Sequence, residues 1–131
     1  MKYTKQEAFD KVVKHIVKQG KPGVDECGSC QYHSEDGLKC AAGCLIKDSK
    51  LRKKVAGEWE EACDTYPSLK NLAPFDFVDR LQSIHDTGAY NLTLSSWRFD
   101  WVTNMKELAK SYKLKVGLLN KLVPKEWLLS R

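Results

Sequence analysis

Residues 27–46 read Cys-Gly-Ser-Cys-Gln-Tyr-His-Ser-Glu-Asp-Gly-Leu-Lys-Cys-Ala-Ala-Gly-Cys-Leu-Ile and hold four of the five cysteines of this 131-residue chain. The cysteines are spaced C-x2-C-x9-C-x3-C, and a turn-forming Asp-Gly dipeptide separates the two pairs. No other stretch gathers so many side chains that bind metal or react. We therefore expect the remaining chain to form a scaffold that holds this segment.

The first half of the segment has the pattern of a small β-hairpin. Residues 31–33 and 38–40 flank the tetrapeptide 34–37, Ser-Glu-Asp-Gly, whose Asp-Gly pair supplies the positive φ angles of a tight turn. Residues 40–46 are apolar and predict a short buried helix. Ala42 and Gly43 have almost no side chain there, which lets another backbone approach closely.

Helical periodicity dominates the rest of the chain. Thr4 and Glu7 form the pattern of a capping box, and apolar residues then recur every three or four positions up to Gly20, which predicts a helix over residues 4–19. A second apolar stripe ends before Pro67 and consists of Leu51, Val55, Trp59, Ala62 and Cys63. Two more stripes predict a helix from Pro74 to Gly88 and one that Ser95 or Ser96 caps, carrying Trp97, Trp101 and Tyr112.

These patterns predict one mainly α-helical domain over residues 1–131. We expect four to five helices, with the small β-hairpin inserted between the first and the second. The apolar tail after residue 116 should pack back on the domain. Trp59, Trp97 and Trp101 fall on helix stripes and are expected in the core, whereas Trp127 is the best candidate for an exposed aromatic ring.

The cysteine spacing predicts a structural zinc site. Zinc takes four sulfur or nitrogen ligands at tetrahedral corners, and a nine-residue hairpin could bring the two pairs together. The expected ligands are Cys27, Cys30, Cys40 and Cys44, and His33 could replace one of them. The alternative is that Cys40 and Cys44 are small buried residues in an apolar run, as free cysteines commonly are. Cys63 lies on a helix stripe, where core packing is the expected role.

The net charge of +5 is mildly basic and permits contact with nucleic acid or an acidic protein. One dense basic cluster, over residues 47–54, could bind phosphates through Lys47, Lys50, Arg52, Lys53 and Lys54. A solvated helix face explains such a cluster more often than a phosphate-binding surface does. The first residues have no signal-peptide pattern, so we expect reduced thiols in a cytoplasm, and no apolar run is long enough to cross a membrane.

One motif resembles a known group of proteins. The run Asp36-Gly-Leu-Lys-Cys-Ala-Ala-Gly-Cys-Leu-Ile46, preceded by Cys30-Gln-Tyr, is similar to a pattern in small uncharacterised proteins of tailed bacteriophages. The run from Leu81 to Asp86 and the aromatic-rich helix after it fit the same pattern. Those proteins usually continue with Pro-Asp-Glu, where this chain has Lys47-Asp-Ser, and Cys27 is not part of the shared motif. The resemblance implies an early or accessory phage protein in the host cytoplasm.

Three functions remain open at this level. The first is a non-enzymatic protein that binds a host protein and alters its activity, because the sequence offers no convergent set of acid, base and nucleophile. The second is a nucleic-acid-binding protein that uses the basic cluster of residues 47–54. The third is a metal- or thiol-dependent enzyme whose site contains the cysteines.

Overall fold

The computed structural model of the protein describes residues 2–25, 29–90 and 92–129. Over these ranges the chain is mainly α-helical, as predicted. The elements, in chain order, are α1 (Lys5–Gln19), the 3-10 turn η1 (Gly43–Leu45), α2 (Ser49–Lys54), α3 (Trp59–Thr65), η2 (Pro67–Asn71), α4 (Phe75–Asp86), α5 (Leu94–Ser111), α6 (Gly117–Leu122) and η3 (Lys125–Leu128). In the part of the chain described, no helix has the length and apolar character needed to span a membrane.

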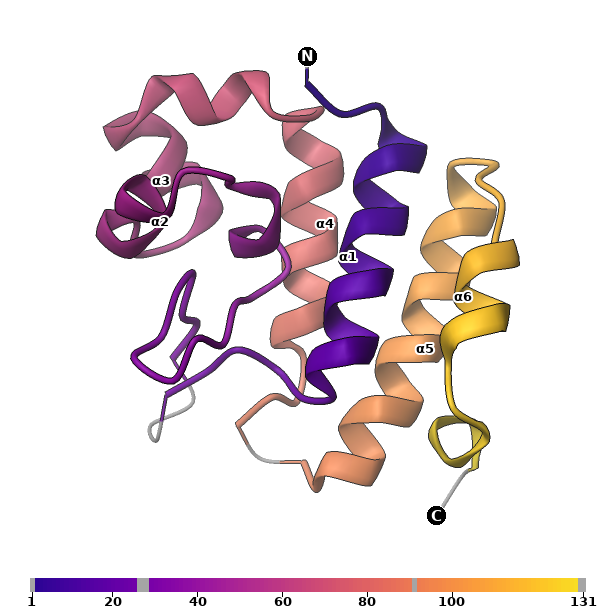
Figure 1. The fold of residues 1–131 in the computed structure, drawn as a ribbon. Coiled ribbons are helices and arrows are strands. Elements are labelled where there is room, and N and C mark those ends of the chain that lie inside the picture. Colours follow the sequence, from indigo (N-terminus) through magenta and orange to yellow (C-terminus); the bar gives the residue numbers. More distant parts are fainter. Residues whose placement is uncertain (1, 26–28, 91, 130–131) are drawn as a thin grey trace.

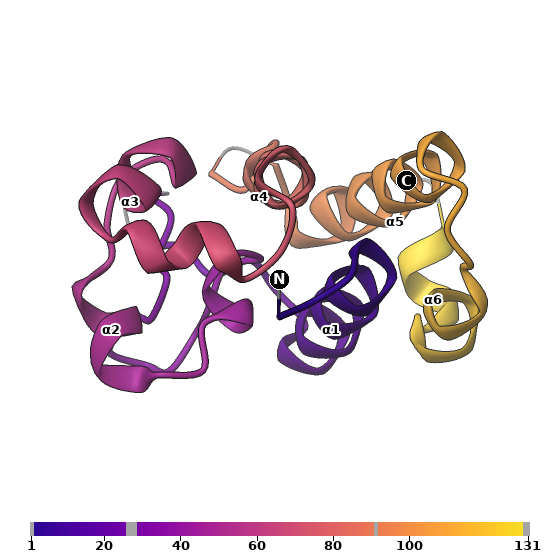
Figure 2. The same ribbon diagram turned by 90° about the horizontal axis from the view of Figure 1, so that it is seen from above.

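Helix α1 is the centre of the molecule (Figure 1). It packs against α4, α6 and η1, while α5 packs against α4 and η3. The short helices α2 and α3 lie at one end of the molecule and α6 lies at the other, as the view from above shows (Figure 2). The long segment between α1 and α2, which carries the cysteines, therefore lies beside α1 and α4.

Local sequence explains where α1 begins and ends. The Thr4 hydroxyl accepts from the Glu7 amide at 3.1 Å, and the Glu7 carboxylate accepts from the Thr4 amide at 2.9 Å, which is the predicted capping box. Gly20 ends the helix with φ of +80°, a left-handed conformation that glycine adopts at little cost. The apolar stripe of α1 is fully buried through Phe9, Val12, Val13 and Ile16.

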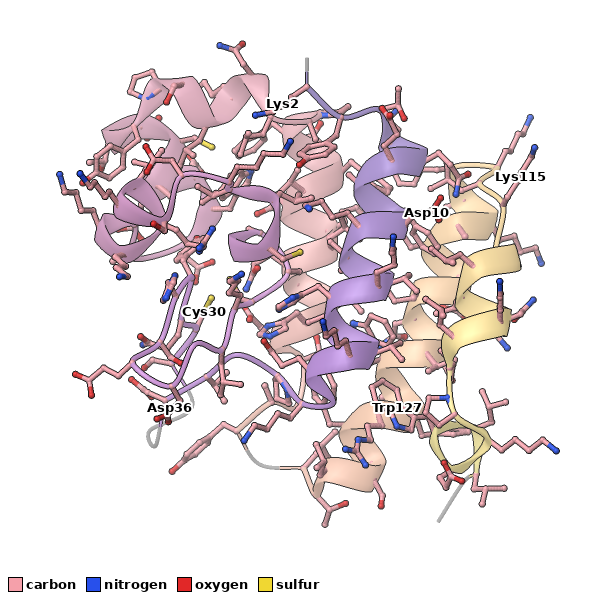
Figure 3. The ribbon with its side chains drawn as sticks, viewed as in Figure 1. Lys2, Asp10, Cys30, Asp36, Lys115 and Trp127 are labelled. Carbon is pink, nitrogen blue, oxygen red and sulfur yellow. The ribbon has the colours of Figure 1, made fainter. Side chains whose placement is uncertain are left out.

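The C-terminal tail packs back on the domain, as expected, because α6 covers α1 and η3 covers α5. Trp59, Trp97 and Trp101 are buried, which confirms their predicted place in the core. The expectation that Trp127 is exposed is wrong, since only 3% of its surface is accessible. Its ring meets Trp101 edge-on at 5.9 Å between centroids, at the base of α5 and η3 (Figure 3). The most exposed large apolar side chain among the described residues is Tyr90 instead.

The predicted β-hairpin is not formed, and residues 31–33 and 38–40 contain no strand. The turn itself exists, because Gly37 has φ of +81° and its amide donates to the Ser34 carbonyl at 3.0 Å. The Gln31 amide donates to the Gly23 carbonyl instead of to residues 38–40. The single antiparallel bridge in the described ranges therefore joins Val24 to Cys30. Two backbone bonds still cross the turn, from the Ser34 amide to the Leu38 carbonyl at 2.8 Å and from the Cys40 amide to the Gln31 carbonyl at 3.0 Å, but they form no strand pair.

Two helix predictions also need correction. The apolar run 40–46 forms only the 3-10 turn η1, and the stripe from Leu51 to Cys63 is split into α2 and α3. Helix α2 ends at Lys54 because Val55 is extended with ψ of 135°, and Gly57, with φ of +82°, also lies outside the helical region. Helix α5 begins two or three residues earlier than expected, with Thr93 as its cap in place of Ser95 or Ser96.

Candidate functional site

Two glycines hold the cysteine segment in place by close backbone contacts. A Cβ atom on Gly23 would lie 2.4 Å from the Lys39 carbonyl carbon, and one on Gly43 would lie 2.3 Å from the Tyr32 carbonyl oxygen. Neither position has room for a side chain, since real Cβ atoms do not come within 3.0 Å of other heavy atoms. The backbone on both sides of the turn at residues 34–37 is therefore tightly packed.

His85 on α4 anchors this segment to the helices. Its Nε2 accepts from the Gly23 amide at 2.8 Å, and its Nδ1 lies 2.8 Å from the Asp86 carboxylate. Because an amide N–H can only donate, Nε2 must be unprotonated and Nδ1 must carry the proton. His85 is therefore a neutral imidazole with no exposed surface, and its role in the described structure is to hold Gly23.

Gln82, one turn before His85, connects the same helix to Cys30 and to the backbone at Ala42. Its carbonyl oxygen accepts from the Ala42 amide at 2.9 Å, and its amide nitrogen donates to the Cys30 sulfur at 3.0 Å and to Asp86 at 2.8 Å. Hydrogen bonding with the Cys40 thiol, followed by burial, raises the pKa of Cys30. Cys30 and Cys40 are thus neighbours beside α4, and Cys30 lies in the segment between α1 and α2 (Figure 3).

Three of the four predicted zinc ligands lie in the part of the chain that the structure describes. Cys27 lies outside the described residues, and Cys44 donates to the Ala41 carbonyl at 3.1 Å. Among the residues described, no three His, Cys, Asp or Glu side chains form a group that could hold a metal ion, so Cys30, Cys40 and Cys44 do not converge on one point. His33 accepts from the Arg52 side chain at 2.8 Å. The structural zinc site stays a prediction.

The most distinctive surface feature is a groove of about 540 Å³ between α1 and the segment that precedes η1. We call it the lysine groove. Lys11, Lys14 and Lys18 share one face of α1 at spacings of three and four residues, and Lys39 reaches the groove from the other side. The remaining lining residues are Glu7, Asp10, His15 and Cys44. None of the four lysines forms an ion pair with any residue that the structure describes.

The lysine groove is an unfavourable place for the cations it contains. Burial, together with the charges of Arg52 and Lys11, lowers the pKa of Lys39. Burial also lowers the pKa of His15, and the charge of Lys39 adds to the effect. The thiol of Cys44 supplies no compensating anion, because burial raises its pKa to about 12. A half-buried lysine among like charges is a feature of binding sites for anions.

The basic cluster of residues 47–54 divides into two kinds of residue. Lys47, Lys50, Lys53 and Lys54 are exposed on and beside α2. Arg52 is buried and donates to the carbonyls of Ile46 and Lys47, so its guanidinium stabilises the turn before α2. Phosphate binding by the exposed lysines stays a prediction, and Arg52 is not free to take part in it.

Comparisons with protein-family models, with curated proteins and with solved structures give no match for this chain. The function of the lysine groove must therefore be inferred from its own geometry. The sequence contained one signal for the lysine groove, the spacing of Lys11, Lys14 and Lys18 on a single helix face. Lys39 carried no such signal, because only the fold brings it opposite α1.

Proposed function

We propose that this protein is a non-enzymatic binding protein that docks on an acidic segment of another protein through the lysine groove. The observation that carries the proposal is the meeting of Lys11, Lys14, Lys18 and Lys39 in one groove with no carboxylate paired to any of them among the described residues. Surface lysines usually remain in water at no cost. Lys39 differs, because it is half-buried and its pKa is lowered by burial and by like charges. A bound carboxylate would relieve that cost.

An apolar recess beside the lysine groove favours a protein partner over nucleic acid. The recess has a volume of about 240 Å³ and is lined mainly by Pro22, Val24, Leu38, Ala89, Leu92, Leu94 and Trp97. Leu38 of the recess precedes Lys39 of the groove, and Lys21 of the recess follows Lys18 by three positions, so neighbouring residues of the chain line the two hollows. A segment with acidic and apolar side chains would fill both. A phosphate backbone would leave the recess empty.

Nucleic acid is less well supported for a second reason. Proteins that bind single strands stack the bases on aromatic rings, whereas the four tryptophans and Tyr32 are buried and Tyr90 is the one largely exposed ring among the described residues. The exposed lysines of α2 are the residues that would bind duplex DNA, so the binding test described below includes duplex DNA as a ligand.

An enzyme that uses a thiol is also less well supported. A nucleophilic cysteine needs a lowered pKa, whereas the pKa values of Cys30, Cys44 and Cys63 are all raised. Nε2 of His85, which could otherwise act as a base, is occupied as the acceptor of the Gly23 amide. The resemblance to phage proteins makes an acidic protein of a bacterial host, in the host cytoplasm, the partner that we propose.

The test is a binding measurement with a defined probe. A fluorescent peptide of alternating glutamate and leucine residues should bind the full chain, with an affinity that falls as salt rises. The double variant Lys14→Glu/Lys39→Glu should lose roughly tenfold or more in affinity, because each change replaces attraction with repulsion. Fluorescence anisotropy measures both effects, and circular dichroism checks that the variant is folded.

The matched control is Lys50→Glu/Lys53→Glu, which changes the net charge equally on α2. It should leave peptide binding within about twofold of the parent chain. Equal losses in the two variants would mean that only net charge matters, and the proposal would then fail. Tight binding of duplex DNA that only the α2 variant loses would favour the nucleic-acid function instead.

A further inference from the structure

Gln19, the last residue of α1, ties the two walls of the lysine groove together. Its side-chain nitrogen donates to the carbonyls of Lys21 and Lys39 at 2.8 and 3.0 Å, and its side-chain oxygen accepts from the Lys39 amide at 2.9 Å. These bonds fix the Lys39 backbone opposite α1. They also fix the orientation of the Gln19 amide, whose nitrogen faces carbonyls and whose oxygen can only accept.

His15 lines the lysine groove one turn before Gln19. Its Nε2 lies 2.8 Å from the Gln19 side-chain oxygen. Because that oxygen can only accept, Nε2 carries the ring proton and Nδ1 carries the lone pair. Nδ1 is therefore the atom at which His15 gains a second proton, and this step leaves the Gln19 bond intact. The groove can thus gain a positive charge without losing the bonds that position Lys39.

The surroundings of His15 decide when it takes up that proton. Burial lowers the pKa of His15, the hydrogen bond to Gln19 opposes this effect, and the charge of Lys39 lowers the pKa further. A fifth cation in the groove of the free protein is therefore disfavoured. The charged and titratable groups around this ring belong to three elements and the segment opposite α1: Glu7, Asp10, Lys11, Lys14 and Lys18 on α1, Lys39 on the opposite wall, Cys44 of η1 and His85 of the adjacent α4.

We propose that His15 is a fifth binding residue of the lysine groove, which takes up a proton from solvent on Nδ1 when an acidic segment binds and donates it in a hydrogen bond to a carboxylate of that segment. His15 has this role only where the groove is the binding site, so the proposal rests on the proposed function. It adds a pH dependence that the four lysines alone would not give, because they stay charged at neutral and mildly acidic pH.

The sign of the pH dependence follows from linkage. Bound carboxylates favour the imidazolium, so the pKa of His15 is higher in the complex than in the free protein. The affinity for an acidic segment therefore rises as the pH falls. This gain is absent well above the higher of the two pKa values and is complete below the lower one.

The first experiment measures binding of a fluorescent peptide of alternating aspartate and leucine residues to the full chain, at about pH 7.5 and about pH 5.5. Aspartate has an ordinary pKa of about 3.9, so the peptide keeps its charge over this range. The affinity of the parent chain should be roughly threefold to tenfold higher at the lower pH, since one unit of change in pKa corresponds to a tenfold effect. His15→Asn should lose most of this gain. The matched control His33→Asn removes a histidine that lies outside the groove and accepts from Arg52, and it should keep the gain.

NMR on the parent chain with labelled histidines needs no variant. At neutral pH the free protein should carry the proton of His15 on Nε2, and saturation with the peptide should raise the pKa of this residue. A proton on Nδ1 in the neutral ring would overturn the proposal. So would a pKa of His15 that the bound peptide leaves unchanged, or a gain in affinity toward low pH that His15→Asn retains in full.

The variant Lys14→Glu/Lys39→Glu, measured with the same peptide, separates the role of His15 from the proposed function. If this variant loses binding while the pKa of His15 does not respond to the peptide, the groove is the binding site and only the role of His15 fails. If the variant binds as tightly as the parent chain, the peptide lies elsewhere and both proposals fail.

Discussion

Replacing Gly43 with alanine should destabilise the protein by about 3 kcal/mol or more, near the upper end of the cost of overpacking. The new Cβ would lie 2.3 Å from the Tyr32 carbonyl oxygen and 2.9 Å from the Tyr32 Cα. Both atoms belong to the backbone, so no flexible side chain can move aside. Relief requires separation of η1 from the segment at Tyr32, which would also disturb the ring of Tyr32 against Trp59. Urea denaturation monitored by tryptophan fluorescence measures the loss.

The matched control for this change is Gly117→Ala. That glycine is the first residue of α6, has no positive φ, and has open space where the Cβ would be. Alanine there should be neutral or stabilise the protein by up to about 1 kcal/mol, through its better helix propensity. Equal stability of the two variants would show that the backbone contact between Gly43 and Tyr32 is absent in solution.

Replacing His85 with phenylalanine should cost about 2 to 3 kcal/mol, although the two rings are similar in shape. The change leaves the buried Gly23 amide without its acceptor at 2.8 Å and removes the donor to Asp86. The edge-on contact of the ring with Trp97, at 6.0 Å between centroids, can survive. The same denaturation measurement applies, and hydrogen exchange at the Gly23 amide should accelerate beyond the global effect.

Asp86→Asn is the control for the His85 variant. The asparagine oxygen can still accept from Nδ1 of His85, and the residue is exposed, so the cost should stay below about 1 kcal/mol. An equal or larger cost for Asp86→Asn would contradict the assignment of His85 as a neutral ring whose main partner is Gly23.

The sequence predicted the elements whose signals are local. Thr4, Glu7 and Gly20 set the limits of α1, and the apolar stripes identified α4 and α5. Periodicity failed between α2 and α3, because Val55 and Gly57 leave the helical conformation without changing the spacing of the apolar stripe. The prediction that Trp127 is exposed was wrong, because the burial of a chain tail depends on the residues it packs against, here Trp101 and Arg98.

The candidate site was less predictable than the fold, because its contacts join residues that are far apart in the sequence. The cysteine segment was recognisable as special, but the contacts of Gly23 with His85 and of Gln82 with Cys30 join residues more than fifty positions apart. The hairpin prediction missed competition from Val24 and Gly23 for the backbone of residues 30 and 31. The lysine groove needs both α1 and Lys39, and no sequence spacing relates them.

The most direct test of the proposed function is the pKa of Lys39 with and without the glutamate–leucine peptide, measured by NMR on the full chain with labelled lysines. In the free protein, burial and the charges of Arg52 and Lys11 should hold this pKa below the ordinary value for lysine. Bound carboxylates favour the charged form, so the pKa of Lys39 should rise when the peptide binds, while the NMR signals of the exposed Lys50 side chain stay in place. A peptide that binds without changing the pKa of Lys39, or that acts mainly on Lys50 and Lys53, would contradict the assignment of the lysine groove as the binding site.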